Sequence, residues 1–315
     1  MNKVYIYINP DSSDNSYKLA FLAILRYYMI KNKYINNFNV KTIFSLNNIN
    51  DNAIVIPIGV ECNYELFKNK YNFNVGNMLD DKILFYKYLE KNDDLLGNIK
   101  IIKSYNYHKC ENILKEFYIK PKDGKGKNDH HVEKDYITNI FKKYDKNIYQ
   151  IQDNVNIKHN YAVNCSCIDG NIIGLFVSTY GLTDFSKKYK RRVKDNIDNN
   201  EIKNCVLKIL QKIKYNGLIE FEFIFDENNN IYLMECNPRM TGFIFIKEYF
   251  DILIIPYIKY QKNKYYKPVQ SKGLNKMIYL DNVYVNCIKF IILLIYEIIK
   301  INILKDLVCY KLKYF

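Results

Sequence analysis

The chain has 315 residues, of which 49% are hydrophobic and 25% charged, and its formal net charge is +14 at pH 7. These values are ordinary for a globular protein with room for two or three structural units. The lysine excess accompanies an abundance of Asn, Ile and Tyr that suggests an AT-rich genome, and no nucleic-acid recognition motif accompanies the charge, so we expect no specific nucleic-acid partner. The densest basic stretch, 187–194, is either a solvated loop or a contact to substrate phosphate.

The first 78 residues predict a small α/β unit of Rossmann-like type. Strands are expected over 3–9, 40–46 and 53–59, with a helix over 17–31. The third strand, AIVIPIG, is apolar enough to be central in a parallel sheet. The turn after the first strand lacks G-x-G-x-x-G, so we assign it no dinucleotide.

From residue 79 onward the pattern changes to α+β. Asp169-Gly170 predicts a hairpin turn between two strands. Helices are expected over 80–91, 107–117, 136–144 and 201–214, and strands over 99–103, 117–120, 148–153, 161–168 and 172–179.

The tail from 251 to 315 is predicted to be mostly helical. Its segment 287–304 is apolar except for Lys289, Glu297 and Lys300, and the longest charge-free run has seven residues. A membrane-spanning helix needs about 20. We expect no transmembrane segment but a helix that packs on the body of the protein, with a homodimer contact or a membrane-surface helix as alternatives.

The eight cysteines and four histidines form no metal-binding pattern. Only Cys165 and Cys167 lie close together, and no histidine pair has the spacing of a zinc motif. Because no secretory signal is visible, we expect reduced, mostly buried thiols and a cytoplasmic protein. The sequence also has neither a Walker P-loop nor a nucleophile elbow.

The most informative segment is YNGLIEFEFIFDENNNIYLMECNPRMTG, residues 215–242. Two apolar runs flank a polar turn, which predicts an antiparallel hairpin. Glu222 lies on the first run, and Glu235, Asn237 and Arg239 follow the second. Pairing of the runs would bring two carboxylates and a carboxamide together, and such hard oxygen ligands suit Mg²⁺. An ordinary hairpin with solvated acids has the same spacing.

Three further motifs precede this hairpin. An Asp-Lys pair at 81–82 opens a predicted helix, YIKPKDGKG at 118–126 joins a lysine-bearing strand to glycines, and IQDNV at 151–155 ends a strand. With the order E-x-N-P-R at 235–239, these segments resemble the ATP-grasp superfamily over more than half of the chain. The hairpin most resembles the carbamoyl-phosphate-synthetase-like branch, although the chain is too short for that duplicated synthetase.

The resemblance implies an N-terminal unit at 1–78, an ATP-grasp domain at 79–250 with nucleotide between two α+β lobes, and an extension at 251–315. It implies a ligase that activates a small-molecule carboxylate as an acyl phosphate for attack by an amine or another nucleophile, forming ADP and phosphate. Positioning and charge neutralisation suffice for such chemistry, which agrees with the absence of a triad. A degenerate nucleotide-binding module is the alternative.

The resemblance also assigns site residues. Glu222, Glu235 and Asn237 would hold one or two Mg²⁺ ions, with Mn²⁺ as a substitute. Arg239, Lys120 and Glu235 would act in catalysis, the arginine through its planar fork of donors.

ATP would be bound mainly by lysines, a glycine-bearing flap and a hinge strand. Lys82 and Lys120 would offer ammonium groups to the phosphates from the lobe opposite to the acids. Asn160 stands where relatives carry a ribose-binding glutamate, so its contact would lack charge assistance. The residues expected to contact ATP are Lys82, Lys120, Asp123, Gly124, Gly126, Gln152, Asp153, Val155 and Asn160.

Overall fold

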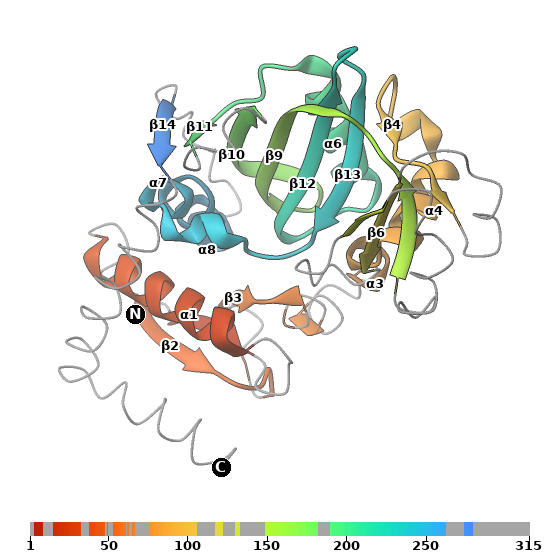
Figure 1. Cartoon of the computed structure of the whole chain (residues 1–315). Helices are drawn as coiled ribbons and strands as arrows, with labels where there is room; N and C mark the ends of the chain where they lie inside the picture. The colour runs from red at the N-terminus through yellow and green to blue at the C-terminus, as the bar shows by residue number, and fades with distance from the viewer. Residues whose placement is uncertain are drawn as a thin grey trace.

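The strands of this protein form three sheets, with three, seven and four members (Figure 1). The computed structural model describes residues 3–8, 15–32, 38–47, 49, 53–60, 62, 65–66, 76–105, 117–121, 130–132, 149–181, 190–262 and 274–279. The helices expected at 136–144 and 287–304 lie outside the described residues, as does all but the last residue of the helix expected at 107–117. Within the described part, no helix is both long enough and apolar enough to cross a bilayer.

The N-terminal unit is a parallel sheet with one long helix. β1 (Lys3–Ile8) lies between β2 (Asn39–Ile43) and β3 (Ile54–Ile58), and α1 (Asn15–Lys31) follows β1. The prediction that the third strand is central was wrong, because β1 is central among the described strands. All five residues of β3 are nevertheless buried. Both α1 and α8 (Ile255–Lys262) contact β3, which explains its apolar sequence.

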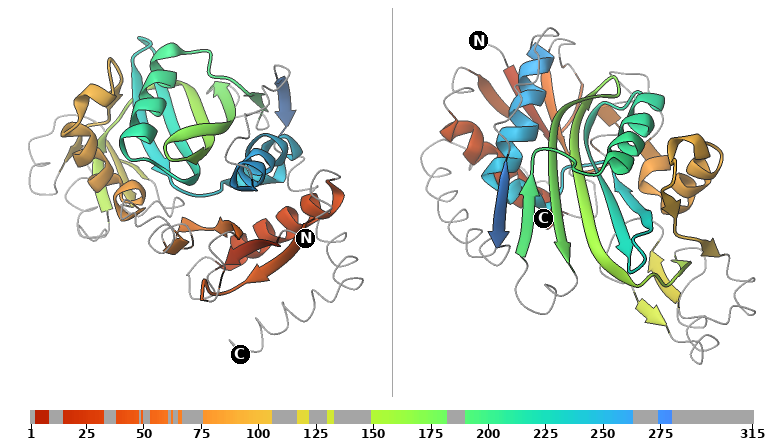
Figure 2. Two further views of the ribbon diagram at one scale, coloured as in Figure 1. Left: turned by 180° about the vertical axis from the view of Figure 1, so that it is seen from behind. Right: turned by 90° about the horizontal axis from the view of Figure 1, so that it is seen from above.

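The seven-stranded sheet is the body of the protein. Its strand order is β14-β11-β10-β9-β12-β13-β4, and all neighbouring pairs except β13–β4 are antiparallel. Figure 2 shows α6 (Asn200–Lys212) packed against one face of this sheet. The N-terminal unit and α8 lie on the side of the opposite face. The strands are β4 (Lys100–Ile101), β9 (Ile157–Ile168), β10 (Asn171–Gly181), β11 (Lys190–Lys194), β12 (Gly217–Asp226), β13 (Ile231–Asn237) and β14 (Asn275–Tyr279).

The turn between β9 and β10 follows the expected hairpin chemistry. Asp169 and Gly170 have φ values of 50° and 75°, and two successive positive φ angles match the I′ turn that an Asp-Gly pair favours. A Cβ on Gly170 would lie 2.6 Å from the carbonyl oxygen of Leu210. The glycine is therefore required both by the turn and by the close approach of α6.

The basic stretch 187–194 is a strand in its second half, so the prediction of a solvated loop was wrong for residues 190–194. β11 pairs with β10 on one side and with β14 on the other. Val193 is fully buried among these basic neighbours. One inward apolar side chain and two strand partners thus order a segment whose composition favours a loop.

The four-stranded sheet forms a second lobe. Its order is β5-β8-β6-β7, from β5 (Ser104–Tyr105), β6 (Phe117–Pro121), β7 (His130–Val132) and β8 (Tyr149–Asp153), and all its pairs are antiparallel. The single strand expected over 99–103 was wrong. The chain instead forms β4 in the large sheet and β5 in the small one, because it crosses there from one lobe to the other.

The helix expected over 80–91 is divided into α3 (Gly76–Asp80) and α4 (Lys82–Glu90). Asp81 separates them as the N-cap of α4, and its Oδ1 accepts hydrogen bonds from the backbone N–H groups of Ile83 at 2.9 Å and Leu84 at 3.0 Å. Such a cap satisfies donors that have no partner inside the helix. Asp81 therefore fixes where α4 begins, with Lys82 in its first turn.

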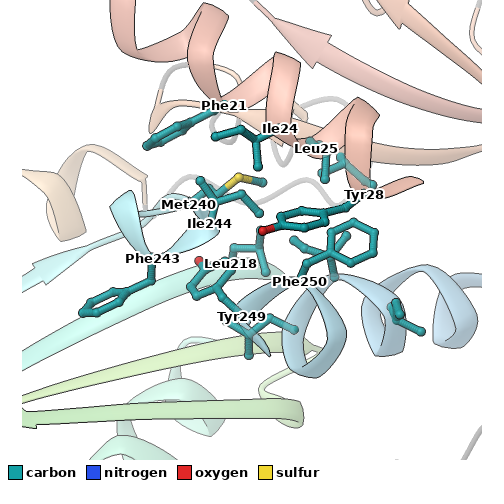
Figure 3. Close-up of a cluster of buried hydrophobic side chains, with 14 of the residues drawn as sticks. Phe21, Ile24, Leu25, Tyr28, Leu218, Met240, Phe243, Ile244, Tyr249 and Phe250 are labelled. Atoms are coloured by element: carbon teal, nitrogen blue, oxygen red, sulfur yellow. The ribbon is translucent and has the colours of Figure 1, made fainter. Parts of the chain in front are cut away.

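A buried cluster joins the N-terminal unit to the large sheet. It includes Leu218 of β12 and the segment that follows β13, namely η5 (Gly242–Phe245), α7 (Lys247–Tyr249) and the π-helical η6 (Phe250–Ile254). Figure 3 shows α1 side chains packed against this segment: Phe21, Ile24, Leu25 and Tyr28 face Met240, Phe243, Ile244, Tyr249 and Phe250. The chain just after the E-x-N-P-R motif is thus held between two units.

Candidate active site

The β12–β13 hairpin carries four oxygen-bearing side chains on one face of the large sheet. In its register, Glu220 lies opposite Asn237 and Glu222 lies opposite Glu235. Directly opposed residues of antiparallel strands point to the same face, and so do residues two apart on one strand. The predicted proximity of Glu222 and Glu235 is therefore present in the strand register.

A β-bulge at Met234 creates this arrangement. Phe223 pairs with Leu233 but Glu222 pairs with Glu235, so Met234 is an extra residue on β13. Leu233 packs in the cluster that contains α6. Without the extra residue, Glu235 would lie on the same face as Leu233 and point toward α6. The bulge shifts the register by one residue and so turns Glu235 to the opposite face. The hydroxyl of Tyr86 on α4 donates to the carbonyl oxygen of Met234 and so contacts the bulge directly.

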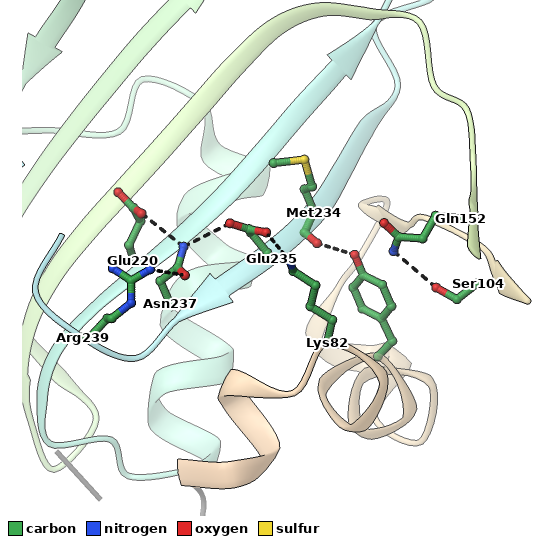
Figure 4. A network of polar contacts seen from close by, with 9 residues as sticks. Lys82, Ser104, Gln152, Glu220, Met234, Glu235, Asn237 and Arg239 are labelled. Atoms are coloured by element: carbon green, nitrogen blue, oxygen red, sulfur yellow. Dashed lines mark hydrogen bonds and ion pairs between the residues drawn. The ribbon is translucent and has the colours of Figure 1, made fainter. Parts of the chain in front are cut away.

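Asn237 connects two of the carboxylates (Figure 4). Its Nδ2 lies 3.3 Å from Oε1 of Glu220 and 3.2 Å from Oε1 of Glu235. Its Oδ1 accepts a hydrogen bond from Nη2 of Arg239 at 3.2 Å. Glu235 and Arg239, which the sequence placed in one site with Asn237, are thus connected through the Asn237 carboxamide.

Glu220 is the site residue that the sequence reasoning missed. Its side chain is buried, whereas Glu222, the acid chosen from the same strand, is half-buried. The two acids lie on the same face of β12, so the alternation of side chains cannot tell which of them lies beside Asn237. The strand register, counted from the turn and including the bulge at Met234, pairs Glu220 with Asn237. The sequence did not reveal this bulge.

Lys82 lies beside the acids, with its Nζ 3.1 Å from Oε2 of Glu235 and only 5% of the residue exposed. Its helix packs Phe85 and Leu89 into the cluster that contains α6. The expectation that Lys82 belongs to the lobe opposite the acids was therefore wrong: it is attached to the large sheet. The helix that the Asp-Lys pair at 81–82 opens was predicted correctly, but the sheet on which it packs depends on tertiary contacts.

The small sheet presents its own polar residues toward α4. Gln150 lies opposite Lys120, and Gln152 lies opposite Tyr118, in the β6–β8 register. Nε2 of Gln152 donates to Oγ of Ser104 at 3.3 Å, and the side chain of Gln152 also hydrogen-bonds to Tyr86. The described backbone places Lys120 on the second lobe, as expected, and its side chain lies outside the description.

Comparison with known proteins finds likeness in structure but not in sequence. By sequence, no family model and no curated protein matches the chain. By structure, it is similar to D-alanyl-alanine synthetase A from Vibrio cholerae (TM-score 0.60, 13% identity, 84% of this chain and 98% of that one). It is also similar to N5-carboxyaminoimidazole synthetase from Staphylococcus aureus (0.56, 16%, 82% and 77%) and to D-alanine–D-alanine ligase from Bacillus anthracis (0.55, 14%, 84% and 100%).

The chain has the ATP-grasp fold. The three neighbours do not single out the carbamoyl-phosphate-synthetase-like branch, which stays a prediction. Tyr86 of α4 contacts both Met234 of the large sheet and Gln152 of the small sheet, so the large-sheet face with Glu220 and the small-sheet face with Gln152 lie on the two sides of this contact.

Buried polar atoms without partners lie on both of these ATP-grasp surfaces. Gln150 is 3% exposed, and neither Nε2 nor Oε1 has a hydrogen-bond partner among the described residues. Asn160 is 6% exposed, and its Oδ1 is equally unpartnered in the described structure. Asn160 shares its face with Glu222, because Ala162, two residues further along β9, lies opposite Glu222. Buried polar groups normally have partners, and a polar ligand that contacts these faces would supply them.

The hinge strand that the sequence predicts to contact ATP, with Gln152, Asp153 and Val155, corresponds to the end of β8 and the connection to β9. Asp153 ends β8, and its backbone N–H donates to the carbonyl oxygen of Lys103 at 3.0 Å. Val155 lies in the short connection that follows and is half-buried. Asp123, Gly124 and Gly126, which the sequence assigns to the flap, lie outside the described residues.

The donor set of the candidate site fits a hard cation. Carboxylates from Glu220 and Glu235 provide oxygen atoms of the kind that Mg²⁺ takes from proteins in small numbers. The amide of Asn237 turns its NH₂ group to both carboxylates and its oxygen to Arg239, so this oxygen would join a cation only after the amide rotates. Among the described residues, no three His, Cys, Asp or Glu side chains are grouped closely enough to hold a metal by themselves. Mg²⁺ in proteins commonly completes its coordination shell with water and substrate phosphates.

Burial keeps the neighbouring hydroxyl and thiol groups protonated. It raises the pKa of Tyr86, and also that of Tyr249, which the carboxylate of Glu220 raises further. Burial likewise raises the pKa of the Cys236 thiol well above its usual value, helped by nearby carboxylates. The expectation of buried free thiols is confirmed for the five cysteines that the structure reports as free, Cys62, Cys165, Cys167, Cys205 and Cys236.

Proposed function

We propose that this protein is an ATP-dependent ligase that joins a small-molecule carboxylate to an amine or another nucleophile. The observation that carries the proposal is the convergence of Glu220, Glu235 and Asn237 beside Lys82, on the face of an ATP-grasp sheet. The structural neighbours include proteins named as ligases and synthetases, which supports the same reaction class for this chain.

The reaction would proceed in two balanced steps. An oxygen of the substrate carboxylate attacks the γ-phosphorus of ATP, the bond from that phosphorus to the β–γ bridging oxygen breaks, and ADP leaves. The amine then attacks the acyl carbon, the carbon–oxygen bond to phosphate breaks, phosphate leaves, and the nitrogen loses a proton. Neither step needs a protein nucleophile, which agrees with a Cys236 thiol that stays protonated.

The side chains of the site would position the reactants and balance their charge. Lys82 offers an ammonium to phosphate oxygens, and Arg239 offers a planar set of donors to a carboxylate or to the transferring phosphoryl group. Glu220, Glu235 and Asn237 would hold Mg²⁺, or Mn²⁺ in its place, and the ion when bound neutralises phosphate charge. Lys82 pairs with Glu235 in this structure. On binding of nucleotide and metal, the lysine would turn to phosphate and the glutamate to the ion.

The remaining assignments belong to the same proposal. ATP would be held by Lys120 and by the hinge at 152–155, with Asn160 toward the ribose. The chain would divide at 78 and 250 into an N-terminal unit, the ATP-grasp domain and an extension. Glu222, half-buried opposite Glu235, is proposed as a further ligand of a second ion.

Turnover of the full-length chain tests the proposal. With ATP, Mg²⁺ and a panel of acid–amine pairs, we expect ADP release that depends on both the metal and one matched pair. Glu235→Gln should reduce this release by at least about 100-fold, since even a residue that only supports a metal ligand is worth up to about that factor. Glu227→Gln, at an exposed acid in the turn of the same hairpin, is the matched control and should retain activity.

A different pattern would contradict the ligase proposal. Thermal stabilisation by ATP without turnover on any acid–amine pair would identify a nucleotide-binding module. Equal ADP release by wild type and Glu235→Gln would show that the hairpin is not the catalytic site.

A further inference from the structure

The carboxylate of Glu220 is held on both of its oxygens by buried carboxamides. Oε2 accepts a hydrogen bond from Nδ2 of Asn164 at 2.9 Å, and Oε1 lies 3.3 Å from Nδ2 of Asn237. Asn164 is directly opposite Glu220 in the β9–β12 register and is completely buried. Oε2 is thus held by the neighbouring strand β9, and Oε1 lies beside Asn237, one of the predicted metal ligands.

The chemistry of these groups fixes the direction of each hydrogen bond. An ionised carboxylate can only accept, so Asn164 must turn its NH₂ group toward Glu220. Oδ1 of Asn164 then faces Thr241, whose Oγ1 is 2.9 Å away. Since a carboxamide oxygen can only accept, the Thr241 hydroxyl must be the donor. Thr241 therefore selects the one amide orientation in which Asn164 supports Glu220.

Thr241 is itself fixed by the core. It is 4% exposed, and its backbone N–H donates to the hydroxyl of Tyr249 at 3.5 Å. Tyr249 and Met240 belong to the cluster that joins α1 to the large sheet. The hydrogen-bonded series Tyr249–Thr241–Asn164–Glu220 thus links this buried cluster to one carboxylate of the candidate site.

We propose that Asn164 and Thr241 are positioning residues for the metal site. They hold Oε2 of Glu220 so that Oε1 stays beside Asn237 and is presented to a divalent cation. Hydrogen-bond partners behind a metal ligand orient it, and their loss commonly weakens metal binding by about 10- to 100-fold. This inference rests on the proposed function, because it assumes that Glu220 faces a bound cation.

Binding of Mn²⁺ to the full-length chain in the presence of ADP tests the inference, with free Mn²⁺ measured by electron paramagnetic resonance. Thr241→Val keeps the shape of the side chain but removes its donor, so we expect Mn²⁺ affinity to fall about 10-fold or more. Thr241→Ser restores the hydroxyl and should remain within about twofold of wild type. Thr179→Val makes the same change on β10, away from this relay, and is the matched control.

A second measurement separates positioning from a general structural role. Affinity for ADP without metal, measured calorimetrically in the presence of a chelator, should be unchanged in Thr241→Val. A merely structural defect would weaken both affinities together, and that result would overturn the inference. Asn164→Ala removes the donor to Glu220 itself and provides the same test if Thr241→Val does not fold.

The outcomes distinguish the inference from the proposed function. If wild type binds Mn²⁺ with ADP and both Thr241→Val and Asn164→Ala bind it equally well, the positioning role is wrong and the ligase proposal stands. If wild type itself binds no Mn²⁺ in the presence of ADP, both are wrong.

Discussion

At the scale of one residue, Gln150 bears on the proposed nucleotide site. Its buried carboxamide has no partner on either polar atom among the described residues. A buried polar group left unpaired costs about 1–3 kcal/mol. The presence of such a destabilising side chain is explained if bound nucleotide supplies hydrogen-bond partners for its two polar atoms.

Gln150→Leu should therefore change stability and binding in opposite directions. Removing the unpaired carboxamide should raise the free energy of unfolding by about 1 kcal/mol, measured by urea denaturation. ADP affinity, measured by calorimetry, should fall by about fivefold or more, since one lost hydrogen bond is worth about 1 kcal/mol.

Gln261→Leu is the matched control for this experiment. Its Nε2 is also buried without a partner in the described structure, but it lies on α8. The Gln261→Leu variant should therefore bind ADP with the affinity of wild type. An unaltered ADP affinity in Gln150→Leu would contradict a nucleotide contact at this residue.

The bulge on β13 is the decisive feature at the scale of an element. The sequence predicted the β12–β13 hairpin, the Asp169-Gly170 turn and the D-K helix, because turn and cap chemistry is local. It did not predict the extra residue Met234, and therefore missed Glu220. Nor did it predict which of the described strands is central in the N-terminal sheet. It also predicted one strand over 99–103, where the chain forms the shorter β4 and then β5 in the other sheet. These features depend on contacts with distant segments, such as the one between Tyr86 and Met234.

Tyr86→Phe tests how far the bulge depends on α4. The substitution removes the donor to the Met234 carbonyl and the hydrogen bond to Gln152. We expect the free energy of unfolding to fall by about 1–3 kcal/mol, because buried groups lose their partner.

Tyr88→Phe on the same helix is the control for Tyr86→Phe. Tyr88 is half-buried, and its loss of a hydroxyl should change stability by less than about 0.5 kcal/mol. Equal stabilities of the two variants in urea denaturation would show that the contact to Met234 does not support the bulge.

At the scale of the whole molecule, one buried cluster connects the N-terminal unit with the segment that follows the β12–β13 hairpin. Leu25 of α1 is fully buried in it, and the Tyr28 hydroxyl donates to the carbonyl oxygen of Phe245 at 3.2 Å. Because Thr241 and Tyr249 lie at this junction, the site and the N-terminal unit should be thermodynamically coupled.

Leu25→Ala should destabilise the protein by about 2–5 kcal/mol, the usual cost of a cavity at a fully buried leucine. Leu84→Ala, at a leucine that is 44% exposed, should cost less than about 0.5 kcal/mol. Chemical denaturation followed by circular dichroism measures both. A small effect of Leu25→Ala would contradict the packing of α1 at this junction.

A crystal structure of the full chain with Mg²⁺ and ADP tests the central claim most directly. We predict nucleotide between the large and small sheets, with Mg²⁺ bound at about 2.0–2.1 Å by oxygens of Glu220 and Glu235, and with Asn237 beside it. Nucleotide bound elsewhere, or a metal held without either glutamate, would contradict the account.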